Sequence, residues 1–280
     1  MYIKLIIIGL YFLSYACFAQ QIKVDLRHRP PEMSLSGENH SGPIIDIVEL
    51  LLADSELEPQ WLNVPWARTL LRAKLGQVDI VPRHSMTPER EKYLLPMLIG
   101  YEQRIIHYLL APNIKNIDKY QSPRQFGNLI FGLLRGSYYG PYVKSIDSNT
   151  STVFTNDINQ LMSLLLTGRI DIMPIQNLSW AEAAYNKVKG KHPGKKYQTT
   201  SFQESFVSGK YLSIPKASPL ATNYHQLNCK LFKLRDAGII DKLYKQYLIP
   251  EYIQIFKNKE SLKQLDSCLQ YQKGLSSQSK

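Results

Sequence analysis

The sequence feature that most constrains the fold is a short pattern that ends a helical run and begins a strand, and it occurs twice. An apolar, helix-forming run ends at Gly76, and the segment Gly-Gln-Val-Asp-Ile continues from there. A second such run ends at Gly168, which opens Gly-Arg-Ile-Asp-Ile. A glycine at the end of a helix adopts a positive φ at little cost, and the apolar residues after it are typical of a buried strand. Two copies at a domain-sized separation predict two similar α/β lobes.

Polar residues follow the first of these predicted strands. The apolar stretch Val78–Val81 is closed by Pro82, and Arg83–Ser85 come directly after it. Thr87 then has the chemistry of a helix N-cap, with Pro88 at the first helical position. Because open α/β sheets bind ligands at the carboxyl ends of their strands, we expect a binding site here.

A glycine-rich loop in the second half of the chain is a further candidate. The loop Arg135–Pro141 follows a predicted strand and contains Gly136, Ser137 and Tyr138. Its glycines and proline are typical of a turn that leads into a helix. A helix N-terminus presents free backbone N–H groups to an anion, so this loop is expected to contribute to a binding site.

The amino end has the composition of a secretory signal peptide. Lys4 gives a positive start, Leu5–Leu13 forms an apolar stretch, and Cys17-Phe18-Ala19 fits a cleavage site after Ala19. The apolar stretch is too short to span a bilayer. The alternative is a lipoprotein signal in which Cys17 becomes lipidated. With residues 1–19 as a signal peptide, we expect an exported, periplasmic chain.

The charge of the chain narrows the classes of partner. The formal net charge is +11, and the densest basic run, Lys187–Lys196, contains a Pro-Gly pair and is expected to be a solvated loop. A basic surface on an exported protein favours anionic solutes or an anionic membrane surface, and we expect no nucleic-acid partner. The six histidines show no metal-ligand spacing, and we expect neither a metal nor a cofactor.

Two cysteines remain after the predicted signal peptide, Cys229 and Cys268. An even pair in an oxidising compartment commonly forms a disulfide. The bridge would hold a carboxyl-terminal extension, residues 249–269, against the helix predicted at Tyr224–Arg235. Two separate buried thiols are the alternative. Residues 270–280 are polar and are expected to be disordered.

Several short sequence motifs, taken in their order along the chain, are similar to the motifs of one protein family. They are Gly42-x-x-x-Asp46, Trp66 before a leucine-rich helix, Gly76-x-Val-Asp79, Met86-Thr-Pro-Glu-Arg90, Gly136-Ser137, Gly168-Arg-Ile-Asp171 and Gly238-Ile-Ile-x-Lys-Leu-Tyr244. In this order they resemble the bacterial extracellular solute-binding proteins of family 3, the polar amino-acid-binding type with the type II periplasmic binding fold. The resemblance implies two α/β lobes joined by two crossover strands. The first lobe would comprise residues 20–110 and 211–269, and the second residues 111–210.

The resemblance also assigns roles to individual residues. Arg90 would bind a ligand carboxylate, because a guanidinium forks onto both oxygens. Ser85 would add a hydroxyl or backbone donor, the Gly136-Ser137 loop would add N–H groups, and Trp66 would stack on the apolar part of the ligand. The alternatives are pairing of Arg90 with Glu89 or Glu91, and core packing for Trp66.

The chain departs from the family pattern where the ligand's amino group would bind. The family places a carboxylate there, and this chain has the neutral Gln176. The expected site is also rich in arginine, with Arg83, Arg90 and Arg68, and poor in carboxylates. We therefore expect a carboxylate-bearing or otherwise anionic small molecule as the ligand, in place of an ordinary amino acid.

The leading hypothesis is a monomeric periplasmic solute-binding protein that closes on its ligand and performs no chemistry. A membrane transporter or sensor is a candidate partner. The alternatives are a dehydratase-like enzyme on the same fold, acting on a small carboxylate, and a ligand-presenting sensor subunit. Candidate acids or bases for such an enzyme are His28, Glu32, His84 and Glu102.

Overall fold

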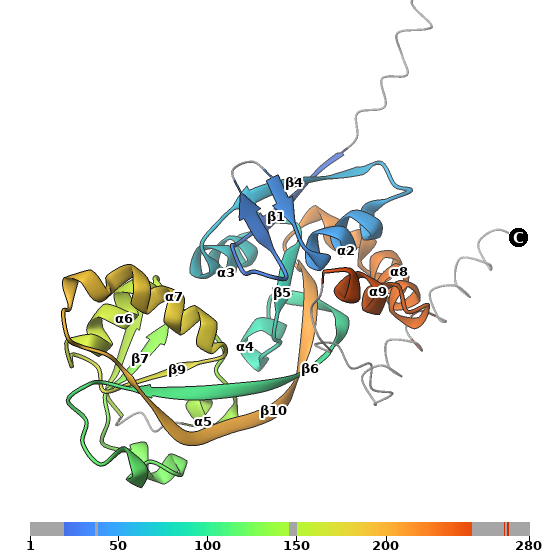
Figure 1. Ribbon diagram of the computed structural model, residues 1–280. Coiled ribbons are helices and arrows are strands. Elements are labelled where there is room, and N and C mark those ends of the chain that lie inside the picture. The colour runs from blue at the N-terminus through green and yellow to red at the C-terminus, as the bar shows by residue number, and fades with distance from the viewer. Residues whose placement is uncertain (1–19, 37–38, 146–149, 248–265, 267, 269–280) are drawn as a thin grey trace, which may run out of the picture.

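The computed structural model describes residues 20–36, 39–145, 150–247, 266 and 268. The predicted signal peptide, the carboxyl-terminal tail and most of the extension after residue 248 therefore lie outside the described residues. Figure 1 shows two lobes connected by two long strands. In the part of the chain that is described, no helix is long and apolar enough to cross a membrane.

The first lobe is built around two short sheets and the start of a larger one. Strand β1 (Gln20–Leu26) runs parallel to β4 (Leu57–Asn63), and the small hairpin β2 (Ser34–Ser36) and β3 (Asn39–Ser41) lies between them in sequence. A parallel bridge from Val24 to Ile80 links β1 to the segment that precedes β5 (Val81–His84). The lobe therefore gathers the carboxyl ends of β1 and β5 at one edge.

Helices cover both faces of this lobe. On one face, α2 (Pro43–Leu52), α8 (Tyr224–Asp236) and α9 (Ile239–Gln246) bury their apolar side chains against β1 and the long strands. Helix α3 (Trp66–Lys74) packs through Ala73 against a smaller cluster with Val78 and Val81. Shorter elements complete the lobe: α4 (Pro88–Glu91) and η5 (Pro219–Asn223).

Two long antiparallel strands cross from one lobe to the other. Strand β6 (Leu94–Leu110) pairs with β10 (Gln198–Pro215) along almost its whole length. The two ends of β6 contribute apolar side chains to different cores. Met97 and Ile99 belong to the core of the first lobe, and Ile106 belongs to that of the second. This arrangement confirms the predicted two-lobed fold with two crossover strands. The lobe boundaries at 110/111 and 210/211 stay a prediction.

The second lobe completes a six-stranded sheet in the order β5-β10-β6-β9-β7-β8. Strands β7 (Phe131–Leu134), β8 (Thr152–Thr155) and β9 (Ile172–Ile175) are mutually parallel, and β9 is antiparallel to β6. Helices α6 (Ile158–Leu166) and α7 (Leu178–Val188) cover one face. An aromatic cluster covers the other face, and it includes Tyr108, Phe126, Phe131 and Tyr139. The remaining short elements are η2 (Ile117–Lys119), η3 (Pro123–Phe126), α5 (Pro141–Lys144) and η4 (Lys189–Lys191).

The repeated glycine joint is present in both lobes. Gly76 has φ 66° after α3, and Gly168 has φ 70° after α6, so each glycine occupies the left-handed region that side chains disfavour. A Cβ on Gly76 would also lie 2.6 Å from the carbonyl oxygen of Ala217. Thr87 caps α4 as predicted, since its side chain accepts a hydrogen bond from the Arg90 N–H at 3.3 Å.

Three local predictions were wrong in detail. Pro82 lies inside β5 and does not close it, which is tolerated because β5 is the edge strand of the larger sheet. The glycine-rich loop leads into α5, a helix of only 4 residues, so it presents no long helix dipole to an anion. The basic run Lys187–Lys196 begins inside α7 and includes η4, although all of its lysines are exposed.

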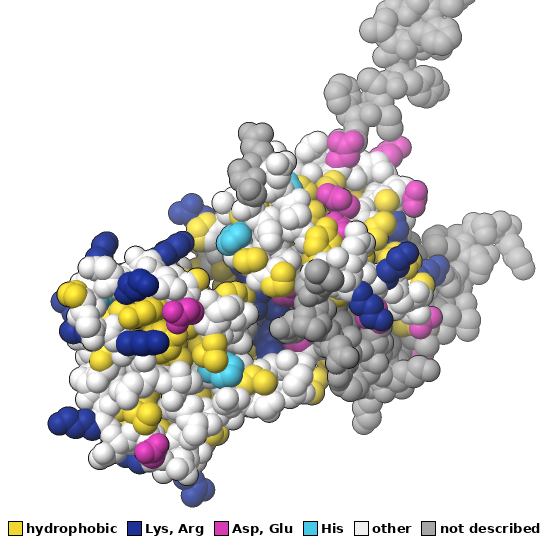
Figure 2. Space-filling view, in the orientation of Figure 1, with side chains coloured by type: hydrophobic (Ala, Val, Ile, Leu, Met, Phe, Trp, Pro, Cys, Tyr) yellow, Lys and Arg dark blue, Asp and Glu magenta, His cyan; other side chains and the backbone are white. Residues whose placement is uncertain are grey.

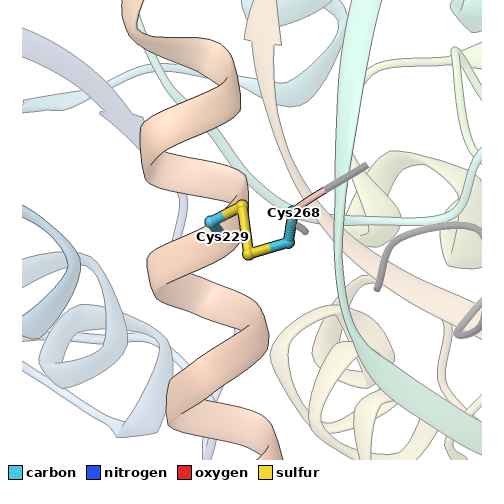
Figure 3. The surroundings of a disulfide bond; sticks show 2 residues. All are labelled: Cys229 and Cys268. Carbon is cyan, nitrogen blue, oxygen red and sulfur yellow. A yellow bond between two sulfur atoms is a disulfide. The ribbon is translucent and has the colours of Figure 1, made fainter. Parts of the chain in front are cut away.

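The predicted disulfide is present in the structure. Cys229 lies in α8, and Cys268 approaches it from the extension with a Cα–Cα distance of 5.0 Å (Figure 3). Both residues are buried. The bond ties a residue beyond α9 to the helical face of the first lobe.

Candidate functional site

Two cavities lie between the lobes and share part of their lining. The larger has a volume of about 510 Å³ and the smaller about 330 Å³. Figure 2 shows Lys or Arg side chains, with Asp or Glu beside them, in the hollow between the lobes. The residues common to both linings are Arg29, Pro30, Arg83, Arg104, Gln176 and Trp180. Because these come from both lobes, lobe movement would open or close the site.

Most of the binding residues predicted from the sequence line the larger cavity. They are Trp66, Arg83, Ser85, Arg90, Ser137, Tyr138 and Gln176. Gly136 adjoins it through its carbonyl oxygen, which accepts hydrogen bonds from the first lobe. Arg68 is exposed on α3 and lines neither cavity, so the structure does not bring it into the site.

Arg90 spans the two lobes. It lies in α4, is buried, and donates through Nη2 to the carbonyl oxygen of Gly136 at 2.7 Å. Its Nη1 donates to the carbonyl oxygen of Ser85. Burial lowers the pKa of Arg90 to about 10. Glu89, one of the alternative partners, instead accepts from Nζ of Lys74 at 2.9 Å. The guanidinium is thus directed into the site, where it bonds main-chain carbonyls.

Trp66 forms a wall of the larger cavity. Its Nε1 donates to the Gly136 carbonyl oxygen at 2.8 Å, and two guanidiniums lie over its ring, that of Arg27 at 4.0 Å and that of Arg90 at 5.1 Å from the centroid. Such cation–π contacts hold the arginines in place. The ring also packs against the cluster around Ala73, so the core-packing alternative describes part of its surroundings.

The glycine-rich loop contributes differently from what the resemblance implied. The Ser137 N–H donates to the Leu134 carbonyl oxygen at 3.1 Å within a turn, and Gly136 offers an acceptor to the first lobe. The Tyr138 carbonyl oxygen accepts from Nε2 of Gln176 at 2.8 Å. The loop therefore positions first-lobe and second-lobe side chains through its carbonyl groups.

A buried ion network borders the cavities, and its carboxylates Glu32 and Glu102 line the smaller one, which corrects the expectation of a site poor in carboxylates. Arg83, in the left-handed region at φ 42°, directs Nε to Glu32 at 2.5 Å and Nη2 to Glu102 at 2.9 Å. Lys210 on β10 bonds Glu32 and lies 3.1 Å from Glu102. Arg104 on β6 donates through Nε to Glu102. Charged residues from four separate segments, namely the loop after β1, β5, β6 and β10, thus meet here.

The two carboxylates of this network are already neutralised. Burial opposes their ionisation, but Arg83 and Lys210 outweigh it: they hold the pKa of Glu32 well below its usual range and that of Glu102 at about 2. Each carboxylate oxygen of Glu102 has two cationic neighbours, and Oε1 of Glu32 also accepts from the Tyr244 hydroxyl at 3.0 Å. Glu102 is contacted by Arg83, Arg104 and Lys210 on its two oxygens, while Oε2 of Glu32 also forms an ion pair with Arg29, whose Nε lies 3.6 Å away.

Three further arginines at the site are only partly compensated: Arg104 is buried, and Arg27 and Arg29 are half-buried. Arg29 donates through Nη2 to Oε1 of Gln176 at 3.0 Å and lies over the Trp180 ring at 4.8 Å. Its Nε, and Nη2 of Arg104, have no hydrogen-bond partner among the described residues. Burial and the positive charge of Arg83 lower the pKa of Arg29 to about 9, and burial lowers that of Arg104. Burial and the charges of Arg29, Arg83 and Arg90 lower the pKa of Arg27 well below its usual range.

Two histidines near the site, His84 and His28, are hydrogen-bonded to uncharged groups. His84 lies between the Ser85 carbonyl oxygen, 2.9 Å from Nδ1, and the Ser213 hydroxyl, 2.9 Å from Nε2. Burial, together with the positive charge of Arg90, lowers its pKa to about 3. Nδ1 of His28 accepts from the Leu35 N–H at 3.1 Å. Across the described chain, no group of three or more His, Cys, Asp or Glu side chains is placed to hold a metal ion.

The sequence did not identify four of the cations at the site: Arg27, Arg29, Arg104 and Lys210. Arg27 and Arg29 follow β1 at the carboxyl end of the strand, the same signal that identified the residues after β5. Arg104 and Lys210 carry no local signal, because they lie inside the crossover strands and meet the site only through the pairing of β6 with β10.

The fold and the position of these cavities define a class of protein. Two α/β lobes, joined by two crossover strands and enclosing a charged cavity, form a two-lobed solute-binding protein. The chain belongs to the bacterial extracellular solute-binding proteins, family 3, whose family model matches residues 21–250.

Solved structures share this fold at low identity. An ancestral arginine-binding protein bound to arginine is 15% identical, with a TM-score of 0.60, over 82% of this chain and 99% of that chain. A structure from work on glutathione import via GshT and the cystine ABC importer TcyBC of Streptococcus mutans is 14% identical, with a TM-score of 0.62, over 86% of this chain and 99% of that one. A histidine kinase sensor domain with similarity to periplasmic binding proteins is 11% identical, with a TM-score of 0.62, over 82% and 96%. No curated protein matches the sequence.

Proposed function

We propose that this solute-binding protein captures a small, carboxylate-bearing or otherwise anionic solute between its lobes. The observation that carries the proposal is the convergence of Arg27, Arg29, Arg90 and Arg104 on one cavity, with buried N–H donors of Arg29 and Arg104 unpaired. An unpaired buried donor is costly, and an anion would satisfy these donors with charge-assisted hydrogen bonds.

The electrostatics favour an anion over a cation. The pKa values of Arg27, Arg29 and Arg90 are all lowered, first by burial and also by neighbouring arginines. A negative solute would reduce this mutual repulsion, and a positive one would increase it. An arginine ligand, as in the ancestral arginine-binding protein, would therefore be disfavoured here.

The site also lacks a good partner for the ammonium group of an ordinary amino acid. Among the described residues lining the larger cavity, Asp157 is the carboxylate, and its Oδ1 already caps α6 by accepting from the N–H groups of Asn159 and Gln160. The amide oxygen of Gln176 accepts from Arg29. An ammonium would therefore have to compete with existing bonds.

We propose binding without chemistry. The enzyme alternative needs a general acid or base with a pKa near the working pH. Glu102, at about 2, and His84, at about 3, lie far from neutrality, and the pKa of Glu32 is also held low. Each of these groups is engaged in structural bonds that would have to break before it could move a proton.

The partner and location follow from the family as proposals. The family is described as extracellular, and we propose that residues 1–19 direct export to the periplasm. The titles of the similar structures name an ABC importer and a histidine kinase sensor domain. We propose that this chain presents its solute to a membrane partner of one of these kinds.

A thermal-shift screen tests the proposed ligand class. The purified protein would be incubated with neutral and basic amino acids, monocarboxylates, dicarboxylates and phosphate. A true ligand at about a hundred times its dissociation constant stabilises the folded state by about 2.7 kcal/mol. We expect stabilisation by carboxylates and none by arginine or lysine. Stabilisation by basic amino acids alone would contradict the proposal.

A further inference from the structure

A second anion-binding position lies where the two cavities meet. Resting on the proposed function, we infer that the solute is a dicarboxylate, with one carboxylate near Arg90 and the other bound by Arg104 and Arg29. The two groups of arginines differ in location: Arg27 and Arg90 line the larger cavity only, and Arg29 and Arg104 line both.

Arg104 is positioned to bind a negatively charged group. Its side chain is 6% exposed and is fixed in direction because Nε donates to Glu102. The oxygens of Glu102 are engaged by Arg83, by Lys210 and by Nε of Arg104 itself, and Nη2 of Arg104 makes no bond to them. That Nη2 atom is buried without a hydrogen-bond partner in the described structure. A carboxylate at the junction of the cavities would satisfy it.

Arg29 completes the position and depends on both lobes. It follows β1 in the first lobe, while its contacts Gln176 and Trp180 belong to the second. Gln176 is itself held by the Tyr138 carbonyl oxygen at 2.8 Å. The unpaired Nε of Arg29 lies 3.6 Å from Oε2 of Glu32, too far for a hydrogen bond. The second position is therefore assembled from both lobes.

The charge balance supports two negative groups over one. The cations around the cavities outnumber the network carboxylates Glu32 and Glu102: Arg83, Arg90, Arg104 and Lys210 are buried, and Arg27 and Arg29 are half-buried. Lys187 and Asp157, which also line the larger cavity, add one charge of each sign. A monocarboxylate would leave most of the excess uncompensated, whereas a dicarboxylate reaches both groups of arginines.

Calorimetry with matched solutes tests this inference in the unmodified protein. Succinate, glutarate and adipate would be compared with butyrate, valerate and caproate, which have the same chain lengths and one carboxylate fewer. The second carboxylate forms hydrogen bonds to charged donors, so we expect the best dicarboxylate to bind about 10-fold or more tightly than its matched monocarboxylate. Inorganic phosphate and chloride serve as probes for simple anion binding.

Variants then locate the second carboxylate. Arg104→Gln and Arg29→Gln should each reduce the ratio between the affinity for the dicarboxylate and that for its matched monocarboxylate. Arg124→Gln is the matched control, since Arg124 is exposed and lines neither cavity. Arg104→Lys keeps the charge but loses the planar guanidinium. We therefore expect its preference for the dicarboxylate to lie between that of Arg104→Gln and that of the unmodified protein.

The outcomes separate the two proposals. Equal affinities for matched dicarboxylates and monocarboxylates would overturn the second position and leave the proposed function standing. Binding of phosphate or chloride alone would overturn the dicarboxylate and indicate a simple anion site. If no anion binds, both proposals fail. The comparison of solutes needs no variant, so it remains decisive even if Arg104→Gln does not fold.

Discussion

At the scale of single residues, Arg90 shows how a predicted role and an observed geometry combine. The guanidinium lies in the cavity, as the resemblance implied, but it bonds the carbonyl oxygens of Ser85 and Gly136. Each arginine has five N–H donors, so these bonds leave donors for a ligand. The same side chain thus links the lobes and remains a candidate for binding the carboxylate of a solute.

Replacing Arg90 tests that role. Arg90→Lys should weaken anion binding by about 1.5–3 kcal/mol, because an ammonium cannot reproduce the bidentate geometry of a guanidinium. Isothermal titration calorimetry with the best carboxylate from the screen measures the loss. Arg124→Lys, at an exposed position outside the cavities, is the control. Unchanged affinity in Arg90→Ala would remove Arg90 from the site.

The depressed pKa of His84 predicts that the free energy of unfolding depends on pH. In the folded protein burial and Arg90 depress its pKa to about 3, while in the unfolded chain it titrates near 6.5. Below about pH 6.5 the unfolded state binds a proton that the folded state does not, so the free energy of unfolding falls as pH falls toward 3. The slope reaches at most about 1.4 kcal/mol per pH unit. Above pH 6.5 this contribution is complete and constant.

Urea unfolding across this pH range checks the prediction. His84→Gln should flatten the stability profile between about pH 6.5 and 4.5, because the titrating group is gone. Below that window the depressed pKa of Glu102 adds a second loss with the same sign, and it continues to about pH 2. His225→Gln, in α8 and outside both cavities, is a suitable control. Parallel profiles for the protein and His84→Gln would show that His84 does not contribute.

At the scale of elements, the two crossover strands place the ion network. Glu102 and Arg104 alternate with exposed residues on β6, so both point to the same face of the strand. Lys210 lies on β10, paired with Gly100 beside them. A register shift in β10 between Lys210 and Tyr211 falls next to this network. Strand pairing therefore fixes which charges meet.

The disulfide links α8 to the carboxyl-terminal extension, and its removal gives a prediction about the free energy of unfolding. Cys229 and Cys268 are separated by 39 residues, for which the loop-entropy estimate is roughly 4 kcal/mol. Cys268→Ala should lower the free energy of unfolding by up to that amount, as measured by urea unfolding. The bond itself is checked by thiol titration of the denatured, unreduced protein. Two free thiols per chain would refute it.

At the scale of the whole molecule, side chains from each lobe contact the other. Trp66 and Arg90 of the first lobe bond Gly136 of the second, and Arg29 bonds Gln176. All of these contacts line or border the larger cavity. Separation of the lobes would break them and expose the arginines to water, so a bound anion is expected to favour the closed arrangement.

Small-angle X-ray scattering tests closure directly. We predict a smaller radius of gyration with saturating carboxylate than without it, because the lobes rotate about the ends of the crossover strands. Arg90→Ala, with weakened binding, should show a smaller change at the same concentration. Scattering curves that superimpose with and without ligand would contradict the closure model.

The sequence by itself determined the features that depend on local chemistry. The glycine joints at Gly76 and Gly168, the Thr87 cap and the ordered motifs of the family could be read because φ preference, capping and burial period are properties of neighbouring residues. These were enough to predict two lobes and the crossover connection, and most of the predicted binding residues line the larger cavity.

Only the tertiary structure decided which charges balance one another. Glu32 and Lys210 are 178 positions apart in sequence, and they meet because the fold brings β10 against the loop after β1. Arg83 was predicted to face the ligand, yet its guanidinium is occupied by Glu32 and Glu102. Arg104 gains its unpaired donor for the same reason, since its neighbour Glu102 is already occupied. Long-range strand pairing sets these partners, and no local pattern encodes it.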